Sequence, residues 1–328
     1  MRRHHPILVF CLVFLCLSCR GQQKERIPFS STERFDFYIN KWLNQHHFLY
    51  KVAEDLAKDS SLQLVALPDF QQLSTADQAK AVEALAYYQA HIIDKNLLFN
   101  AELATVKAQL SQLPDQVSWE ATSFEAPLVA VWKTFGPVYE KYFWPSHKAK
   151  NEKVVRQHLD RITSFEDRAL TRLSQLAQAE WPAAKIRVDV SFYADWAGAY
   201  TSTKPLHIVI STATLGPEGD WIEMLFHEAS HSLISGRRGM VAATIKEIAT
   251  ESDLSIPRQL WHAVLFYFAG TVTQELLMEE GVDYERYMLR EKVFNQYYEK
   301  LDIHMKPYLQ GEVELKIALK QLMGSLQE

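Results

Sequence analysis

The stretch 226-FHEASHSLISG-236 decides how the C-terminal half of this chain is expected to fold. Its apolar residues share one face at a spacing of 3.6 residues, which predicts an amphipathic helix over residues 221–235. Asp220 and Glu223 have the spacing of a capping box at the start of that helix. Gly236 stands where a left-handed residue commonly ends a helix. We therefore predict one well-delimited helix here.

Two histidines and a glutamate on this helix have the spacing of a metal site. His227 and His231 lie one turn apart, so both imidazoles can direct a nitrogen at the same ion. Glu228 follows the first histidine and can reach a water on that ion without binding the ion itself. The alternative is a pair of surface histidines with a solvated glutamate.

A small sheet is predicted immediately before this helix. Residues 185–194 alternate apolar and polar side chains, and residues 206–213 are rich in β-branched residues, so both segments indicate strands. The segment between them contains Gly, Ser, Thr and Pro, which is typical of a turn or a short extra strand. Helical patterns return at 240–252 and 257–279, and weaker ones follow.

The N-terminal half is predicted to be helical. We expect helices over residues 31–59, from Ser74 onward, over 127–143 and over 150–179, packed on one another within a region 32–181. The remainder, 182–328, contains the sheet and the histidine helix. The chain is thus expected to have a mostly α-helical α+β fold.

The first residues are predicted to be an export signal. Two arginines precede an apolar run from Ile7 to Leu17, which is too short to span a membrane comfortably. All three cysteines lie within residues 1–19, so a disulfide framework in the folded part is excluded. Residues 20–31 are then a polar tether.

The end of this signal resembles that of bacterial lipoproteins. Leu17, Ser18 and Cys19 match the pattern in which a cysteine becomes the lipidated first residue, although Cys16 replaces the usual aliphatic residue. The resemblance implies a lipid anchor on Cys19 as the only membrane attachment, and a place in the bacterial cell envelope. Plain secretion is the alternative.

Length and charge narrow the possible partners. The chain has 328 residues, enough for one large domain or two smaller ones, and a net charge of -5. A nucleic-acid partner is not expected, because there is no excess of basic residues to neutralise phosphates. The sequence does not indicate an oligomeric state.

Residues 185–235 resemble the zincin metallopeptidases, in which a strand leads through a short loop into an HExxH helix. The resemblance implies zinc held by His227 and His231, with Glu228 as general base acting on the water bound to the zinc. It also implies a peptide or protein substrate lying along a nearby strand edge. That edge would be in residues 199–203 or in the strand 206–213.

The third zinc ligand is less obvious. The metzincin branch is excluded, because Ile234 occupies the place of its required Gly and no His follows nearby. Glu251 lies twenty residues after His231, a spacing similar to that of thermolysin-like enzymes, but Ser255 stands where those enzymes carry an Asp.

His262 and Glu275 are the other candidates, both on the helix predicted over 257–279. They fall on opposite sides of that helix, so only one can face the site. His262 lies in WHAVLFY, which faintly resembles a segment of uncharacterised bacterial HExxH proteins. We favour His262, with Glu251 as the nearest alternative.

The predicted function is a zinc-dependent hydrolase, foremost a metallopeptidase. Tyr200 and Tyr267 are candidates to hydrogen-bond a developing oxyanion, with core packing as the alternative for each. Two other functions stay open. One is a non-catalytic zinc-binding envelope lipoprotein with a structural or partner-binding role, and the other is hydrolysis of a non-peptide amide.

Overall fold

A mostly helical α+β fold, as predicted, is seen in the computed structural model, which describes residues 26–59, 64, 67–182, 184–214, 216, 218–236 and 239–327. The strands are β1 Ser30–Ser31, β2 Phe35–Tyr38, β3 Ile186–Ser191, β4 Ala199–Thr203 and β5 Leu206–Ser211. The helices are α1 Lys41–Lys58, α2 Pro68–Gln71, α3 Thr75–His91, α4 Ala101–Leu110, η2 Trp119–Ala121, α5 Ala126–Tyr142, α6 Trp144–Ala177, α7 Glu218–Ser230, α8 Met240–Ser252, α9 Leu260–Glu279, α10 Tyr287–Arg290, α11 Asn295–Leu309 and α12 Leu315–Ser325. None of these helices is both long and apolar enough for a membrane span.

The five strands form one mixed sheet in the order β1-β2-β3-β5-β4. β3 pairs in parallel with β2 on one side and with β5 on the other, and both outer strands are antiparallel to their neighbours. Val188 and Val190 of β3 and Ile208 and Ile210 of β5 are fully buried. Central strands with this composition need cover on both faces, and helices provide it.

The predicted helix over 31–59 is wrong at its start. Residues 35–38 form β2, and α1 begins only at Lys41, where Asn40 caps it by accepting from the backbone N–H groups of Trp42 and Leu43. β2 pairs with β3, some 150 residues later in the chain (186 − 35 = 151). The periodicity of a short segment carries no information about a strand partner so far away in the sequence, so the strand was not predicted.

The N-terminal part of the described chain packs on the fold. The Arg26 guanidinium donates to the backbone oxygens of Leu113 and Ile39 and pairs with Asp115, and Ser30–Ser31 forms β1. Residues 26–31 of the predicted tether are therefore attached to the fold at both ends. Cys19 and the predicted signal lie outside the described residues.

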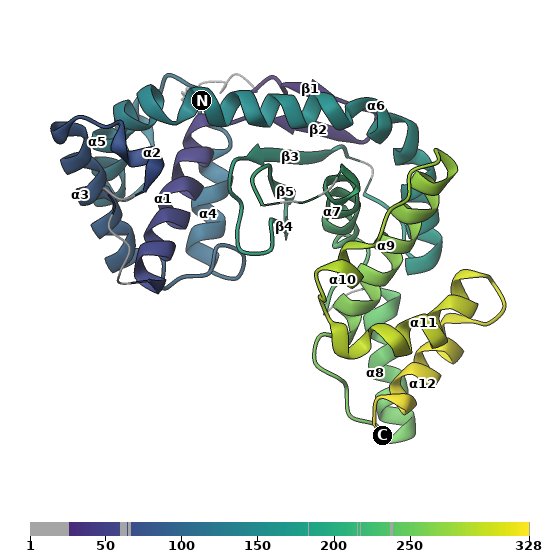
Figure 1. The fold of residues 1–328 in the computed structure, drawn as a ribbon. Helices are drawn as coiled ribbons and strands as arrows, with labels where there is room; N and C mark the ends of the chain where they lie inside the picture. Colours follow the sequence, from purple (N-terminus) through teal and green to yellow (C-terminus); the bar gives the residue numbers. More distant parts are fainter. Residues whose placement is uncertain are drawn as a thin grey trace, which may run out of the picture.

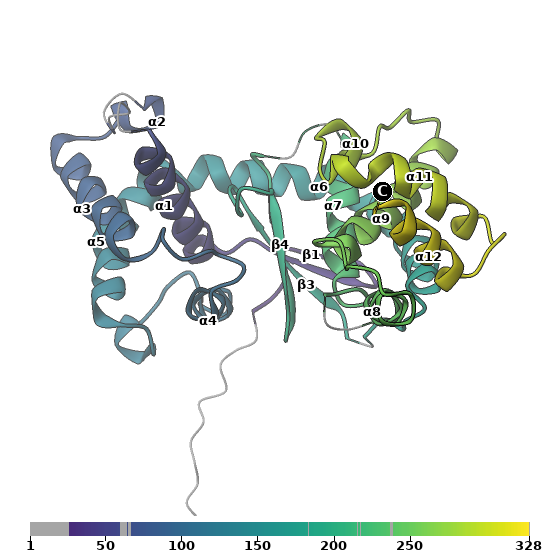
Figure 2. The ribbon, with the colours of Figure 1, turned by 90° about the horizontal axis from the view of Figure 1, so that it is seen from below.

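The 34-residue helix α6 connects two groups of helices and is about 50 Å long. In Figure 1 it runs along the top of the molecule, from α1–α5 at one end to α7–α12 at the other, with β3, β5 and β4 beneath it. Figure 2 shows the same arrangement from below, with β4 between the two groups. Only Phe143 separates α5 from α6. Pro145 lies in the first turn of α6, where a proline costs no hydrogen bond, so the helix can begin directly before it.

A buried network of amides fixes α1 and α6 to the end of β3. The Asn151 amide donates to Asn44 Oδ1 at 2.9 Å and accepts from the Thr212 hydroxyl at 2.6 Å. Asn44 in turn donates to the Val190 carbonyl at 3.1 Å and accepts from the Phe192 N–H at 2.8 Å. The network thereby holds α1 and α6 against the ends of the parallel strands β3 and β5.

We predict that Asn151→Ala lowers the free energy of unfolding by about 2–3 kcal/mol, because it leaves buried partners of this network unpaired. Denaturant unfolding followed by circular dichroism measures the change. Lys150→Ala, on the exposed side of the same helix, is the control and is expected to have little effect. Equal stabilities of the two variants would contradict the role of the network.

Candidate metal centre

The site lies between α7 and α9, which pack against each other in opposite directions. Glu223, His227 and His231 follow one another at four-residue spacing on one side of α7 and the turn after it. His227 packs on Phe266 with ring centroids 3.7 Å apart, and His231 lies beside His262. One turn further along α9, Glu223 lies against Gly270.

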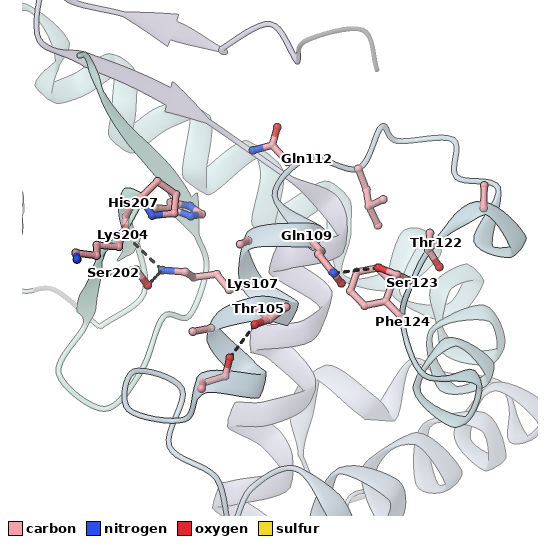
Figure 3. A pocket seen from close by; sticks show the side chains of 16 residues that line it. Thr105, Lys107, Gln109, Gln112, Thr122, Ser123, Phe124, Ser202, Lys204 and His207 are labelled. Atoms are coloured by element: carbon pink, nitrogen blue, oxygen red, sulfur yellow. Dashed lines mark hydrogen bonds between the residues drawn. The ribbon is translucent and has the colours of Figure 1, made fainter. Parts of the chain in front are cut away.

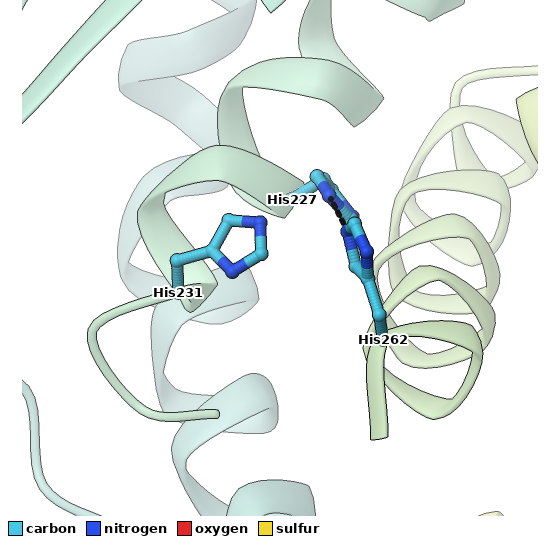
Figure 4. Close-up of side chains that lie close together, drawn as sticks. All are labelled: His227, His231 and His262. Atoms are coloured by element: carbon cyan, nitrogen blue, oxygen red, sulfur yellow. Dashed lines mark hydrogen bonds between the residues drawn. The ribbon is translucent and has the colours of Figure 1, made fainter. Parts of the chain in front are cut away.

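The three histidines have the geometry of a metal-binding group (Figure 4). One nitrogen from each of His227, His231 and His262 lies within 4.8 Å of the others, and Nε2 of His227 is 3.2 Å from Nε2 of His262. Two nitrogens bound at about 2.0–2.1 Å to a tetrahedral ion are about 3.3 Å apart. The group could therefore hold a metal ion after small side-chain adjustments.

His262 completes the group, and the two other candidates for a third ligand lie elsewhere. Glu251 and its neighbour Glu247 are exposed and pair with Lys316. Glu275 is exposed on α9, facing away from the histidines towards Arg172. Among the described residues, no fourth His, Cys, Asp or Glu belongs to the group. Three protein ligands leave a coordination position for water or substrate.

The surroundings keep all three imidazoles neutral. Burial lowers the pKa of His227 well below its usual value, that of His231 to about 4 and that of His262 to about 3. Trp261 stacks on His262 with an interplanar angle of 12°, and Phe294 contacts the same ring edge-on. Neutral imidazole is the form that binds metals, so near pH 7 these rings are in the binding state.

The HExxH helix is shorter than predicted, and it ends before its second histidine. α7 spans Glu218–Ser230, so His231 lies in the following turn, where its N–H bonds to the Glu228 carbonyl at 3.3 Å. Gly236 is not left-handed. It packs so closely on Trp261 that a Cβ there would lie 2.9 Å from the indole nitrogen. Its lack of a side chain serves packing rather than helix termination.

The predicted capping box is also wrong, because both residues lie inside the helix. Asp220 accepts from the Gly216 N–H at 3.1 Å and pairs with Arg290. Glu223 accepts from the Tyr284 hydroxyl instead of from a backbone N–H at the start of α7. Both carboxylates are fully buried, and apart from Gly216 their partners are residues of the segment after α9.

Glu228 lies beside the histidines, on the side of α7 that faces the sheet. Its Oε2 is 4.0 Å from Nε2 of His231 and 2.6 Å from the hydroxyl of Thr201 on β4. The same hydroxyl is 3.1 Å from the Glu228 carbonyl oxygen. Burial raises the pKa of Glu228 to about 8 in the absence of a cation. The carboxyl is thus held next to the histidine group at the edge of the sheet.

Neither tyrosine predicted as a substrate contact reaches the histidine group. Tyr200 precedes Thr201 on β4 and so points to the opposite face of the sheet, where its hydroxyl lies 2.8 Å from Nε2 of His47. The Tyr267 hydroxyl donates to Asp302 of α11 at 2.9 Å. Both rings are buried, as the core-packing alternative requires.

Of the two strands predicted as a possible peptide-binding edge, β4 is the edge and β5 is internal. β4 is also the strand whose Thr201 hydroxyl contacts Glu228, so the free edge of the sheet lies next to that carboxyl group. A cavity of about 470 Å³ lies where β4 ends and is lined by Thr203, Pro205 and His231, among others. The site therefore has open space next to one of its ligands.

A cavity of about 650 Å³ lies on the other face of the sheet and does not include the histidine group (Figure 3). It is formed by α4, the segment 121–124 and the β4–β5 turn. Lys107 projects from α4 and donates to Ser202 at 2.6 Å and to the His207 carbonyl. Burial lowers the pKa of Lys107 to about 7, which reflects its packing under β4.

The sequence did not indicate Thr201 or the role of Glu223. Thr201 is one of several hydroxyl residues in a strand whose pairing partner had to be known first. Glu223 precedes His227 by one helical turn, and that spacing was visible. The pattern instead predicts a helix cap at Glu223, because the predicted helix starts three residues later than α7 does (221 − 218 = 3).

Comparison with protein-family models, with curated proteins and with solved structures found no match. Support for a function therefore comes from this chain's own residues. These are the three histidines on α7, its following turn and α9, and the carboxyl group of Glu228 beside them.

We predict that the purified protein binds one divalent metal ion and that His262→Ala weakens binding at least 100-fold, because one of three ligands is lost. Competition with a chromophoric chelator measures the affinity. His91→Ala removes an exposed histidine of α3 and is expected to bind as the unaltered protein does. Unchanged binding by His262→Ala would show that these imidazoles do not form the metal site.

Proposed function

We propose that the protein is a zinc-dependent hydrolase and that its substrates are peptides or proteins. The observation that supports this most is the convergence of His227, His231 and His262 within 4.8 Å, with the carboxyl group of Glu228 beside them. Nitrogen ligands suit zinc among several transition metals, and three ligands with an open position are typical of catalytic zinc. A structural zinc site would instead be closed by four protein ligands.

The residues divide the chemistry between them. When bound, zinc would polarise a scissile carbonyl and lower the pKa of water in the open position. The three imidazoles hold the ion and, being neutral, leave its positive charge undiminished. Glu228 takes a proton from the attacking water and passes it to the leaving amine. The Thr201 hydroxyl orients the carboxyl group of Glu228 for both transfers.

The edge strand β4 would position the substrate. An extended peptide can add to a free strand edge through backbone hydrogen bonds, which need no particular side chains. Thr201 lies in β4 and contacts Glu228, so a peptide paired with this strand would bring its backbone close to the histidine group. The cavity beside His231 could accept a substrate side chain near the cleaved bond.

We also propose that the protein works outside the cytoplasm. The basic and apolar N-terminal segment, and the Leu17-Ser18-Cys19 sequence at its end, support export followed by lipid attachment to Cys19. Because the chain has no cysteine after residue 19, the exported protein would fold without disulfides. Metabolic labelling with a fatty acid, compared between the wild type and Cys19→Ala, tests the anchor.

A peptide-library digest of the zinc-loaded protein, with and without a chelator, tests the proposed activity. Glu228→Gln is expected to lower turnover by at least 10²-fold while zinc still binds, since Gln cannot accept the water's proton. Glu251→Gln alters an exposed glutamate paired with Lys316 and is the matched control. If the zinc-loaded protein cleaves no library peptide, or if Glu228→Gln is as active as the control, the proposal is wrong.

Thr201→Val is expected to lower kcat about 10-fold on a peptide identified by the digest, and to leave zinc affinity unchanged. The substitution keeps the size of the side chain but removes the hydroxyl that lies 2.6 Å from Glu228. Thr201→Ser retains the hydroxyl and should keep most of the activity. A Val variant with full kcat would mean that this hydrogen bond serves only the fold.

A further inference from the structure

Glu223 is a fully buried carboxylate on the histidine side of α7. One oxygen, Oε2, has two partners, the Tyr284 hydroxyl at 2.7 Å and the Tyr287 N–H at 3.0 Å. The other oxygen, Oε1, is buried and has no hydrogen-bond partner among the described residues. A buried carboxylate oxygen without a partner is costly, so its position calls for an explanation.

His227 has a complementary unpaired atom. Its Nε2 faces Nε2 of His262, so the other ring nitrogen, Nδ1, points away from the group. Nδ1 is also buried and has no partner among the described residues. A histidine that binds a metal through Nε2 carries its proton on Nδ1, and that N–H normally donates to a carboxylate or a carbonyl. His227 therefore needs an acceptor next to α7.

The two unpaired atoms lie on residues one helical turn apart. Glu223 and His227 are at positions i and i+4 on the same side of α7, so their side chains are neighbours. α9 leaves room for the carboxylate at Gly270, where a Cβ would lie 3.0 Å from Oε1. A larger residue at position 270 would push Glu223 out of its place.

We infer that Glu223 is a positioning residue, whose Oε1 accepts the Nδ1–H of His227 when the histidines hold their ion. Tyr284 and Tyr287 fix the carboxylate through its other oxygen, and the carboxylate then fixes the tautomer and the orientation of the imidazole. The inference rests on the proposed zinc site, but it does not require turnover.

One competing partner exists for Oε1. The Nε of Arg286 is also buried without a partner, and Arg286 approaches the same side of Gly270. If Oε1 pairs with Arg286, Glu223 is a structural residue only. The two possibilities differ in what they predict for metal binding, because only the pairing with His227 connects Glu223 to the ligand nitrogen.

Glu223→Gln tests the inference through zinc affinity, measured by chelator competition, and through the visible spectrum of the Co²⁺-substituted protein. The Gln oxygen would remain with Tyr284 and Tyr287, so its NH₂ would face His227 and donate to Nδ1. That arrangement leaves the imidazole proton on Nε2, where the ion should bind. We expect zinc to bind about 10–100-fold more weakly and the Co²⁺ absorption to shift.

Glu218→Gln is the matched control, because it makes the same change at an exposed carboxylate of α7, which pairs with Arg161. Its zinc affinity and Co²⁺ spectrum are expected to stay near those of the wild type. The inference is overturned if Glu223→Gln binds zinc with wild-type affinity and an unchanged spectrum, or if Glu218→Gln weakens binding as much as Glu223→Gln does.

Nitrogen-15 NMR of the histidines in the zinc-loaded wild type gives a readout that needs no variant. The inference predicts a protonated, hydrogen-bonded Nδ1 on His227, and a proton in rapid exchange with solvent there would contradict it. Failure of the zinc site itself looks different, since His227→Ala, His231→Ala and His262→Ala would then all bind zinc as well as the wild type. Absence of peptide cleavage would overturn the proposed activity and leave these binding results as they are.

Discussion

The packing of α7 against α9 is the contact on which the site depends. It places the three imidazoles in an apolar interface, with Phe266 against His227 and Trp261 against His262. Burial in such an interface is costly for a charged ring, so the histidines stay neutral without needing carboxylates around them. The same helix turns its other side to the sheet, where Phe226 meets Phe35 of β2.

The two sides of α7 thus have different tasks. Its apolar side, fully buried at Ile222, Phe226 and Ala229, attaches the helix to the sheet, and this determines where Glu228 meets Thr201 of β4. Its polar side carries the histidines and Glu223 towards α9. Because Glu228 and His227 lie on the same helix, the distance between the general-base candidate and this histidine is set by the helix rather than by a loop.

Local patterns predicted much of this architecture. The strands at 186–191 and 206–211, the Ser74-capped helix α3, and α8 follow directly from periodicity and capping residues. The prediction failed where a distant partner decides. The sequence of β2 predicts the start of a helix, but pairing with β3 makes it a strand. Phe35 and Phe37 of this strand are buried against α7. The prediction of where α7 begins was wrong for a related reason. Asp220 and Glu223 do not cap the helix but bind side chains from residues 284–290.

The candidate site was predictable in part. HExxH gave two histidines and a glutamate from spacing alone, whereas the choice of His262 over Glu251 depended on which helix packs on α7. Tyr200 and Tyr267 illustrate the limit of such reasoning. Both lie close to the motif in sequence, yet strand alternation and helix rotation direct their hydroxyls to His47 and Asp302.

The separation of the ligands along the chain has a mechanical consequence. His231 and His262 are 31 positions apart (262 − 231 = 31), and α8 lies between them. An ion bound by both would act as a reversible cross-link that closes this loop and limits the freedom of the unfolded chain, as a disulfide bridge does in many proteins. The chain has no cysteine after residue 19 and so can form no disulfide in its folded part. A metal ion bound by His231 and His262 would provide the cross-link that a disulfide provides in other proteins.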